Sequence, residues 1–113
     1  MDIHEDWIGD VVVVAPAGRI DSTTSADLDA RLLALDAGGR LRIVVDFSGV
    51  EYISSAGLRV MLTLAKRTKD RNGRLALCVL DRSVRQVFDL AGFTPLFTVA
   101  ASRAQAVAAV ASR

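Results

Sequence analysis

The chain has 113 residues, of which 51% are hydrophobic and 24% charged, a composition typical of one globular domain whose core needs no disulfide. Its formal net charge of +1 argues against nucleic acid or an anionic membrane as a partner. The single cysteine, Cys78, cannot form an intramolecular disulfide, and its apolar neighbours predict a core strand. With an acidic N-terminus and no long apolar stretch, these features predict a cytoplasmic protein without membrane insertion.

The N-terminal segment predicts a β-hairpin. Residues 2–7 and the β-branched run at residues 11–17 flank a turn at residues 9–10. Pro16 is expected at the end or the edge of a strand, because proline cannot donate to a ladder hydrogen bond. Residues 18–21 are expected to leave the sheet and lead into the first helix.

The next segment predicts a helix and then a buried strand. The hydroxyl residues at 22–24 offer N-caps for a helix that runs to about Asp36 and stops at the glycine pair 38–39. Its apolar stripe consists of Leu28, Leu32 and Leu35. The run at residues 41–46 is short, apolar and rich in β-branched residues, which predicts a buried strand.

A second helix is predicted at residues 54–71, where Ser54 and Ser55 can cap its first backbone N–H groups. Its predicted apolar stripe consists of Leu58, Met61, Leu62 and Ala65. Gly57 is a poor helix former in the first turn, which indicates close approach of another backbone or of a partner.

The C-terminal part continues the alternation. A strand is predicted at residues 74–80, a helix at 81–91, at best a short edge strand within 93–99, and a last helix that Ser102 caps and that ends near Ala111. The residues of the third helix expected to face inward are Val84, Val87, Phe88 and Ala91.

This order of elements predicts an α/β fold in a single domain spanning residues 1–113. We expect a mixed sheet of four or five strands that opens with a hairpin, and about four helices packed mainly on one side. The predicted core comprises Val13, Ile43, Val45, Leu62, Leu77, Val79, Val87 and Phe88.

The start of the second helix is the main candidate site. Ser55, Arg59 and Thr63 follow a spacing of four residues and share the face opposite the apolar stripe. A serine hydroxyl is therefore presented at the positive end of a helix, with an arginine one turn away, in a place suited to adding or reading charge. The alternative is that Ser54 and Ser55 act only as N-caps.

Other polar and aromatic residues have simpler interpretations. Asp46 and Asp21 are expected to accept backbone N–H groups in a loop and a turn. His4 is expected at the surface, and Trp7 in packing. The basic run Lys66, Arg67, Lys69 and Arg71 predicts a solvated helix face, with phosphate recognition as the alternative.

The residues expected of an enzyme are largely missing from the sequence. The one histidine is far from the serines, and no Gly-x-Ser-x-Gly elbow accompanies them, so a serine hydrolase would lack its base. No clustered spacing of histidine, cysteine and carboxylates indicates a metal, and no Gly-x-Gly-x-x-Gly follows a strand. We predict a non-enzymatic protein without a cofactor, although the start of the second helix could bind a nucleotide weakly.

Three segments resemble one family. Residues 45–58, Val-Asp-Phe-Ser-Gly-Val-Glu-Tyr-Ile-Ser-Ser-Ala-Gly-Leu, resemble the signature of STAS domains of the bacterial anti-sigma factor antagonist type. Gly-Arg-Ile-Asp at residues 18–21 and Ser-Val-Arg-Gln-Val-Phe-Asp-Leu-Ala-Gly at residues 83–92 are similar to two further family segments. The resemblance therefore covers essentially the whole chain and implies the STAS fold.

The resemblance also implies a mechanism known as partner switching. Such proteins bind an anti-sigma factor that is also a GHKL-type serine kinase, the kinase ends the binding by phosphorylating a serine, and a PP2C-type phosphatase reverses this. The alignment places the phosphoacceptor at Ser55, with Ser54 as the alternative; Ser54 stands where the family often has aspartate, and Ala56 where it often has a second hydroxyl.

The partner-binding surface expected on this basis comprises Asp21, Ser22, Thr23, Ser54, Ser55, Ala56, Gly57, Arg59 and Thr63. The family resemblance leaves one alternative open, namely a cytoplasmic accessory subunit of a membrane transporter or of another regulatory complex.

Overall fold

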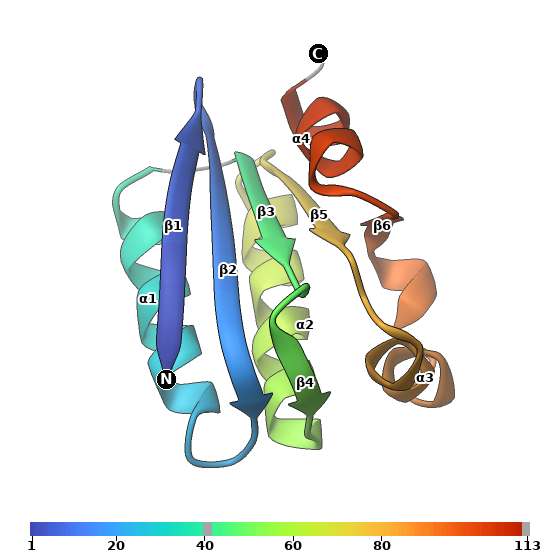
Figure 1. Ribbon diagram of the computed structural model, residues 1–113. Coiled ribbons are helices and arrows are strands. Elements are labelled where there is room, and N and C mark those ends of the chain that lie inside the picture. The colour runs from blue at the N-terminus through green and yellow to red at the C-terminus, as the bar shows by residue number, and fades with distance from the viewer. Residues whose placement is uncertain (40–41, 112–113) are drawn as a thin grey trace.

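The β-sheet is built around β2 (Val11–Ile20), which begins with four consecutive valines (Figure 1). The computed structural model describes residues 1–39 and 42–111, without the side chains of residues 36 and 37. β1 (Asp2–Ile8) runs antiparallel along one side of β2 and completes the predicted hairpin. On the other side, β3 (Arg42–Asp46) pairs with β2 in parallel through Val12–Val14.

The remaining strands extend this arrangement. β5 (Arg74–Cys78) pairs in parallel with β3, and β6 (Thr98–Ala100) pairs in parallel with β5 at the far edge. β4 (Val50–Ile53) lies off this path and pairs in parallel with the end of β2. The described residues thus form a mixed six-stranded sheet, and the strand that the sequence did not predict is β4.

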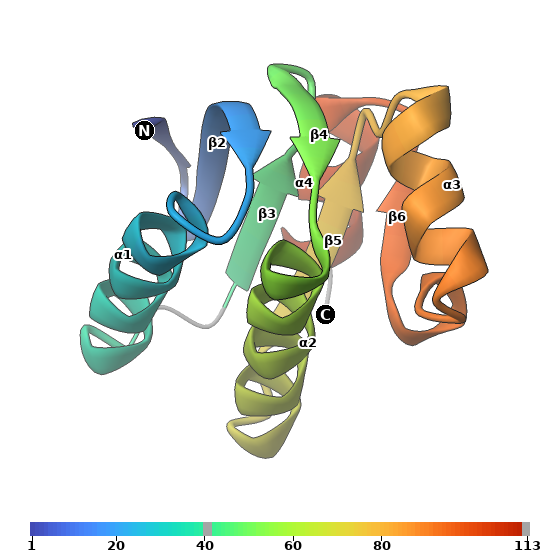
Figure 2. The same cartoon turned by 90° about the horizontal axis from the view of Figure 1, so that it is seen from below.

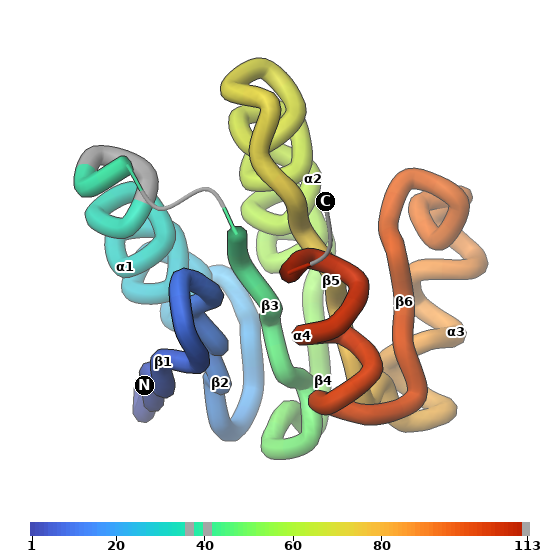
Figure 3. The backbone as a smooth tube through the Cα atoms, turned by 90° about the horizontal axis from the view of Figure 1, so that it is seen from above, coloured from blue at the N-terminus to red at the C-terminus, as the bar shows by residue number. Residues whose placement is uncertain are grey.

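Alternation along β2 divides the core between the two faces of the sheet. Val12 and Val14 contribute to the larger cluster, whose helical members come from α1 (Ser25–Ala37), α2 (Ser55–Asp70) and α3 (Arg82–Leu90). Val11 and Val13 contribute to the smaller cluster, which α4 (Arg103–Ala111) covers. Figure 3 shows α1 and α2 on one side of the sheet and α4 on the other, so the prediction of helices mainly on one side is confirmed.

The aromatic side chains hold the end of the larger cluster together. The rings of Phe47 and Phe88 meet edge to face with centroids 5.9 Å apart, and Phe88 meets Phe97 in the same way at 5.6 Å. Such pairs add about 0.5–1.5 kcal/mol to the free energy gained from burial alone. They link the end of β3, helix α3 and the segment after the 3₁₀ turn η1 (Thr94–Leu96).

Two predictions about the sheet were wrong. Residues 18–20 do not leave the sheet, because β2 continues to Ile20 and pairs there with β4. Pro16 is buried inside β2 and not at its end or at an edge of the sheet. It lies between the residues of β2 that pair with β3 and those that pair with β4, where neither parallel partner is in register with it.

The predicted core is confirmed for Val13, Ile43, Val45, Leu77 and Phe88, all of which are buried. Leu62 and Val87 are only half-buried, and Leu64 and Thr68 take the buried positions of α2 in place of Leu62 and Ala65. The buried stripe of α2 therefore lies to one side of the predicted stripe, toward Leu64 and Thr68.

Val79, Ala91 and Trp7 are also more exposed than predicted. β5 ends at Cys78, and Val79 has a φ of 57°, which turns its side chain out of the alternation of the strand. Ala91 follows α3 as its C-cap, and Trp7 lies near the end of β1 with 47% of its surface exposed. In each case the residue stands at the end of an element, where the regular pattern of burial stops.

Leu77 provides a test of the larger core cluster, because its side chain is fully buried. We expect Leu77→Ala to lower the free energy of unfolding by about 2–5 kcal/mol in urea denaturation, from lost burial and the cavity left behind. Leu90→Ala is the matched control, since Leu90 is 81% exposed and should cost less than about 0.5 kcal/mol. Equal losses in the two variants would contradict this account of the core.

Candidate functional site

The two segments predicted to form the site meet through the backbone. The N–H of Ser54, after β4, donates to the carbonyl oxygen of Ile20, at the end of β2, over 2.8 Å. This bond follows directly from the parallel pairing of Ile20 with Ile53. The β2–α1 turn and the start of α2 therefore lie side by side, as the predicted surface requires.

The β2–α1 turn is organised by the carboxylate of Asp21. Its Oδ1 accepts the hydroxyl of Thr23 at 2.7 Å and the backbone N–H groups of Thr23 and Thr24 at 3.0 and 3.1 Å. These bonds favour the ionised carboxylate, and they lower the pKa of Asp21 from 3.8 to about 2, with the Thr23 hydroxyl as the largest cause. The prediction of Asp21 as a turn residue is confirmed, and Ser22 and Thr23 are exposed beside it.

Ser54 is the N-cap of α2, as predicted. Its side-chain oxygen accepts the N–H of Gly57 at 3.3 Å, and its carbonyl accepts the N–H of Leu58 at 2.9 Å. Ser55 is the first residue of the helix and is exposed. Within the described part of the chain no hydrogen bond occupies the Ser55 hydroxyl, whereas Ser54 is engaged in capping.

Gly57 does permit a close approach, but what approaches it is the side chains of Ile20 and Ile53 in the same domain. It is buried, and a Cβ atom at this position would come within 2.7 Å of both Ile20 Cγ2 and Ile53 Cγ1. A side chain here would push α2 away from the ends of β2 and β4. Gly57 is therefore buried and positions the site from beneath, while its place in a partner-binding surface stays a prediction.

A shallow groove of about 300 Å³ runs between the N-terminal halves of α1 and α2. The structure brings Ala56, Arg59 and Thr63 together along it, next to Ser55 in the chain. The Thr63 hydroxyl donates to the carbonyl of Arg59 at 2.9 Å, which leaves it as an acceptor toward the groove. The opposite wall consists of Ser25, Ala26 and Asp29, and α2 also contributes Val60.

Sequence reasoning missed the α1 wall and an arginine–tyrosine pair nearby. The guanidinium of Arg19 lies over the ring of Tyr52, 4.2 Å from its centroid, and the hydroxyl of Thr24 donates to the Arg19 carbonyl at 2.6 Å. The side chains of Arg19 and Tyr52 are exposed. Their positions in the sequence could have indicated this pair, because Arg19 lies two residues before Asp21 and Tyr52 two residues before Ser54.

Asp46 orders the loop after β3, as predicted, and also holds α4. Its Oδ1 accepts the N–H of Ser48 at 2.9 Å, and its Oδ2 receives Arg103 Nε at 2.9 Å and Nη2 at 2.8 Å. Burial by itself would raise the pKa of Asp46, but the Ser48 N–H and the Arg103 guanidinium outweigh it and lower that pKa. Arg103 also contacts Asp6 of β1 at 2.7 Å, so one arginine ties α4 to two strands.

The buried thiol of Cys78 lies on β5, the strand beside β3. Burial raises its pKa to about 11, with a further contribution from the negative charge of Asp46. The thiol therefore stays protonated at neutral pH and behaves as a core residue.

The predicted basic run on α2 divides between two surroundings. Arg67 is half-buried, and its Nη2 lies 3.8 Å from Oδ1 of Asp29 on α1. Lys66, Lys69 and Arg71 are exposed. His4 is exposed on β1, as predicted. Across residues 1–39 and 42–111, no three histidine, cysteine, aspartate or glutamate side chains gather as a metal site would require. None of the helices in this part of the chain has the length and apolar character needed to cross a membrane.

The fold and this surface define a small mixed α/β domain whose candidate site is an open face made by one turn and two helices. The chain belongs to the STAS domain family, whose model matches residues 5–106. Its sequence is 40% identical over 109 residues to the Bordetella bronchiseptica protein named "Putative anti-sigma factor antagonist BtrV", covering 96% of this chain and 94% of that one.

Solved structures share the fold. An anti-sigma factor antagonist from Mycobacterium paratuberculosis superposes with a TM-score of 0.90 at 23% identity, covering 98% of this chain and 94% of that one. The anti-sigma factor antagonist SpoIIAA in its unphosphorylated form gives 0.81 at 22% identity, covering 96% of each chain. The phosphorylated form of SpoIIAA, a Bacillus cell fate determinant, gives 0.75 at 20% identity, covering 96% of this chain and 99% of that one.

The acidity of Asp21 yields a prediction about pH. Because its pKa falls from 3.8 to about 2 on folding, the ionised carboxylate favours the folded state above about pH 4, and this contribution is lost as the pH falls through about 2. We expect Asp21→Ala to have a lower Tm than the wild-type protein, by a constant difference above about pH 5. This difference in Tm should shrink between about pH 4 and pH 2. Calorimetry across this range measures the difference in Tm. An equal difference at about pH 2 and pH 7 would contradict a lowered pKa of Asp21 in the folded state.

Proposed function

We propose that this chain is an anti-sigma factor antagonist that acts by phosphorylation-controlled partner switching. In this proposal it binds an anti-sigma factor that is also a GHKL-type serine kinase while Ser55 is unphosphorylated, and a PP2C-type phosphatase restores that state. The support is membership of the STAS family together with 40% identity to a relative that bears the name of such an antagonist. The activity is binding, without a chemical step by the domain itself.

The observation that carries the proposal is the contrast between the two serines. Ser55 is exposed at the first residue of α2, with a hydroxyl that makes no hydrogen bond to the described residues, whereas the Ser54 oxygen accepts the Gly57 N–H as the helix cap. A kinase could therefore modify Ser55 without breaking the hydrogen bond that starts the helix. The Asp21 turn on one side and the groove along Arg59 on the other supply the area for a partner.

Electrostatics explain how a phosphate at Ser55 would end binding while leaving the fold intact. The group would carry about −1.5 to −2 charges, and a helix N-terminus favours such an exposed charge by roughly 0.3–1 kcal/mol. In a partner interface the same group would have to lose its water, which costs several kcal/mol unless a cation compensates. A difference of about 1.4 kcal/mol already changes affinity tenfold.

The first test is the site of modification. After incubation with the cognate kinase and ATP, peptide mass mapping should place one phosphate on Ser55. Ser55→Ala should bind the kinase constitutively, because it removes the acceptor and retains the Ser54 cap. Ser55→Asp should weaken binding only in part, since it carries one charge and two oxygens where a phosphate carries nearly two charges and three oxygens.

Ser54→Ala is the matched control. This variant should still be phosphorylated at Ser55, but it should lose roughly 0.5–2 kcal/mol of stability with its cap. Phosphate on Ser54 in the wild-type protein would overturn the assignment. Stable binding to a transporter, with no binding to any GHKL kinase, would support the accessory-subunit alternative instead.

Arg59 tests the surface itself. It is exposed beside the α1–α2 groove, so we expect Arg59→Glu to weaken kinase binding at least tenfold, or about 1.4 kcal/mol, in isothermal titration calorimetry. The free energy of unfolding should change by less than about 0.5 kcal/mol, as for other surface substitutions. Arg85→Glu, at an exposed position of α3, is the control that should bind normally. Equal affinities for the two variants would move the interface away from α2.

A further inference from the structure

A second and larger groove, of about 740 Å³, lies at the other end of α2. Leu75 of β5 and Phe97 before β6 line it, with the C-terminal half of α2 on one side and η1 on the other. Figure 2 shows α2 and α3 standing apart over the sheet. The groove is lined from the α2 side, and no residue of α3 contributes to it. Its volume falls within the range of about 300–1,000 Å³ that is usual for binding sites.

The apolar lining of this groove is only partly covered by the domain. Leu62 belongs to the apolar stripe of α2 that the sequence pattern predicts to be buried, yet it is half-buried here. Leu75 and Phe97 are also half-buried, and Leu96 on η1 is 56% exposed. These side chains place exposed apolar atoms together in one concave site, where an apolar side chain of a ligand could contact them.

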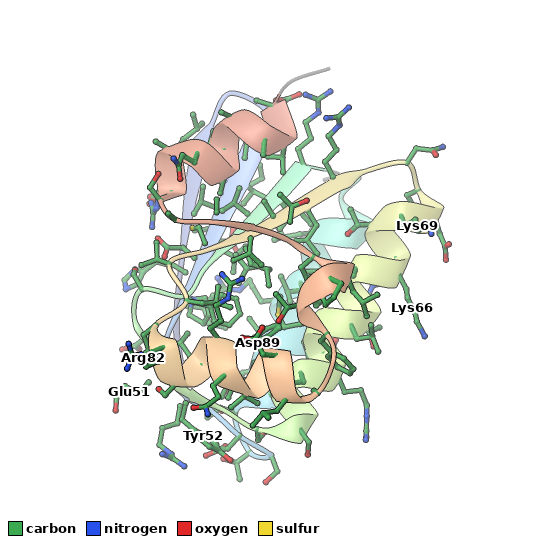
Figure 4. All side chains as sticks on the ribbon, turned by 90° about the vertical axis from the view of Figure 1, so that its right-hand side faces the viewer. Glu51, Tyr52, Lys66, Lys69, Arg82 and Asp89 are labelled. Atoms are coloured by element: carbon green, nitrogen blue, oxygen red, sulfur yellow. The ribbon has the colours of Figure 1, made fainter. Side chains whose placement is uncertain are left out.

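The charged residues that line the groove all have one sign. Its charged lining residues are Lys66, Lys69 and Arg74, and no carboxylate lines it. Within residues 1–39 and 42–111, none of these three cations forms an ion pair. Figure 4 shows the Lys66 and Lys69 side chains extending from α2. On a chain whose net charge is only +1, this concentration of unpaired positive charge is local.

We propose that this groove binds a short acidic segment of a partner protein. An apolar side chain of that segment sits against Leu75 and Phe97, and its carboxylates lie near Lys66, Lys69 and Arg74. The apolar contact excludes water, whereas the exposed charge pairs direct the approach and orientation and are weakened by salt. A second copy of this chain joined through the same groove would bring like charges together, which disfavours a symmetric dimer as the occupant.

The groove is separate from the surface proposed for the kinase. At about 1.5 Å per residue, Lys69 lies about 21 Å along α2 from Ser55. The kinase surface uses α2 as far as Thr63 and the groove uses it from Leu62 onward, so the two surfaces share no lining residue although they adjoin at mid-helix. The second binding site goes beyond partner switching at Ser55 and does not depend on it.

The test uses the full chain, ¹⁵N-labelled for NMR, and a capped peptide of glutamates around a central leucine. We expect the peptide to shift the amide signals of Lys69, Gly73 and Thr98, with weaker binding as salt is raised. The double variant Lys66→Glu/Lys69→Glu should weaken binding at least tenfold. The matched control Arg82→Glu/Arg85→Glu, on α3, and the variant Ser55→Asp should both stay within about twofold of wild type.

Two further peptides separate the apolar and charged contributions. Replacing the central leucine by serine, or the glutamates by lysines, should each abolish the shifts at the groove. Equal shifts with the serine peptide, or none with the leucine peptide at millimolar concentration, would overturn the proposal. It would also be overturned if sodium decanoate bound the groove in place of the peptide. Shifts of the same amide signals with protein concentration alone would overturn it as well, because they would identify a second copy of the chain as the occupant.

Discussion

The parallel pairing of β4 with the end of β2 places the candidate site. β2 is bordered by β1 along one side and, on the other, first by β3 and then by β4. Because Ile20 and Ile53 are opposite each other, the next residue, Ser54, donates its N–H to the Ile20 carbonyl. One strand pairing thus brings the Asp21 turn to the start of α2, and the surface proposed for a partner exists only because of it.

Helix α2 serves both the core and the surface, and its small residue Gly57 makes this possible. The backbone of α2 packs directly on Ile20 and Ile53, where even a methyl group would clash. This contact fixes the helix start against the sheet while Ser55, on the outer side, stays exposed. A charge added at Ser55 would meet water and the positive helix end, so the fold can tolerate a modification that a tightly packed partner could not.

The two ends of α2 differ in chemistry. The N-terminal end combines a shallow groove beside the cation of Arg59 with the hydroxyl groups and the ionised Asp21 of the neighbouring turn. The C-terminal end combines cations with half-buried apolar side chains around a larger groove. The first groove lies between the two helices α1 and α2, whereas the second lies between α2, η1 and the strands β5 and β6.

The sequence by itself determined most of the helices and strands and the cap of α2. Local rules are sufficient there: hydroxyl residues satisfy the first N–H groups of a helix, apolar residues repeat at its period, and valine-rich runs form strands. These local rules predicted Ser54 as a cap, Asp21 in a turn and the leucine stripe of α1. The family motif around residues 45–58 could also be recognised, because a motif is a local pattern.

Only the tertiary structure decided which surfaces these elements expose. β4 has four residues and no apolar alternation, so its place beside β2 depends on a partner that is distant in sequence. The same holds for Gly57, whose close approach is to Ile20, and for Leu62, whose exposure depends on how far η1 stands from α2. Burial and grooves are properties of neighbouring elements, and a periodic pattern specifies the inward side of a helix without specifying whether another element covers it.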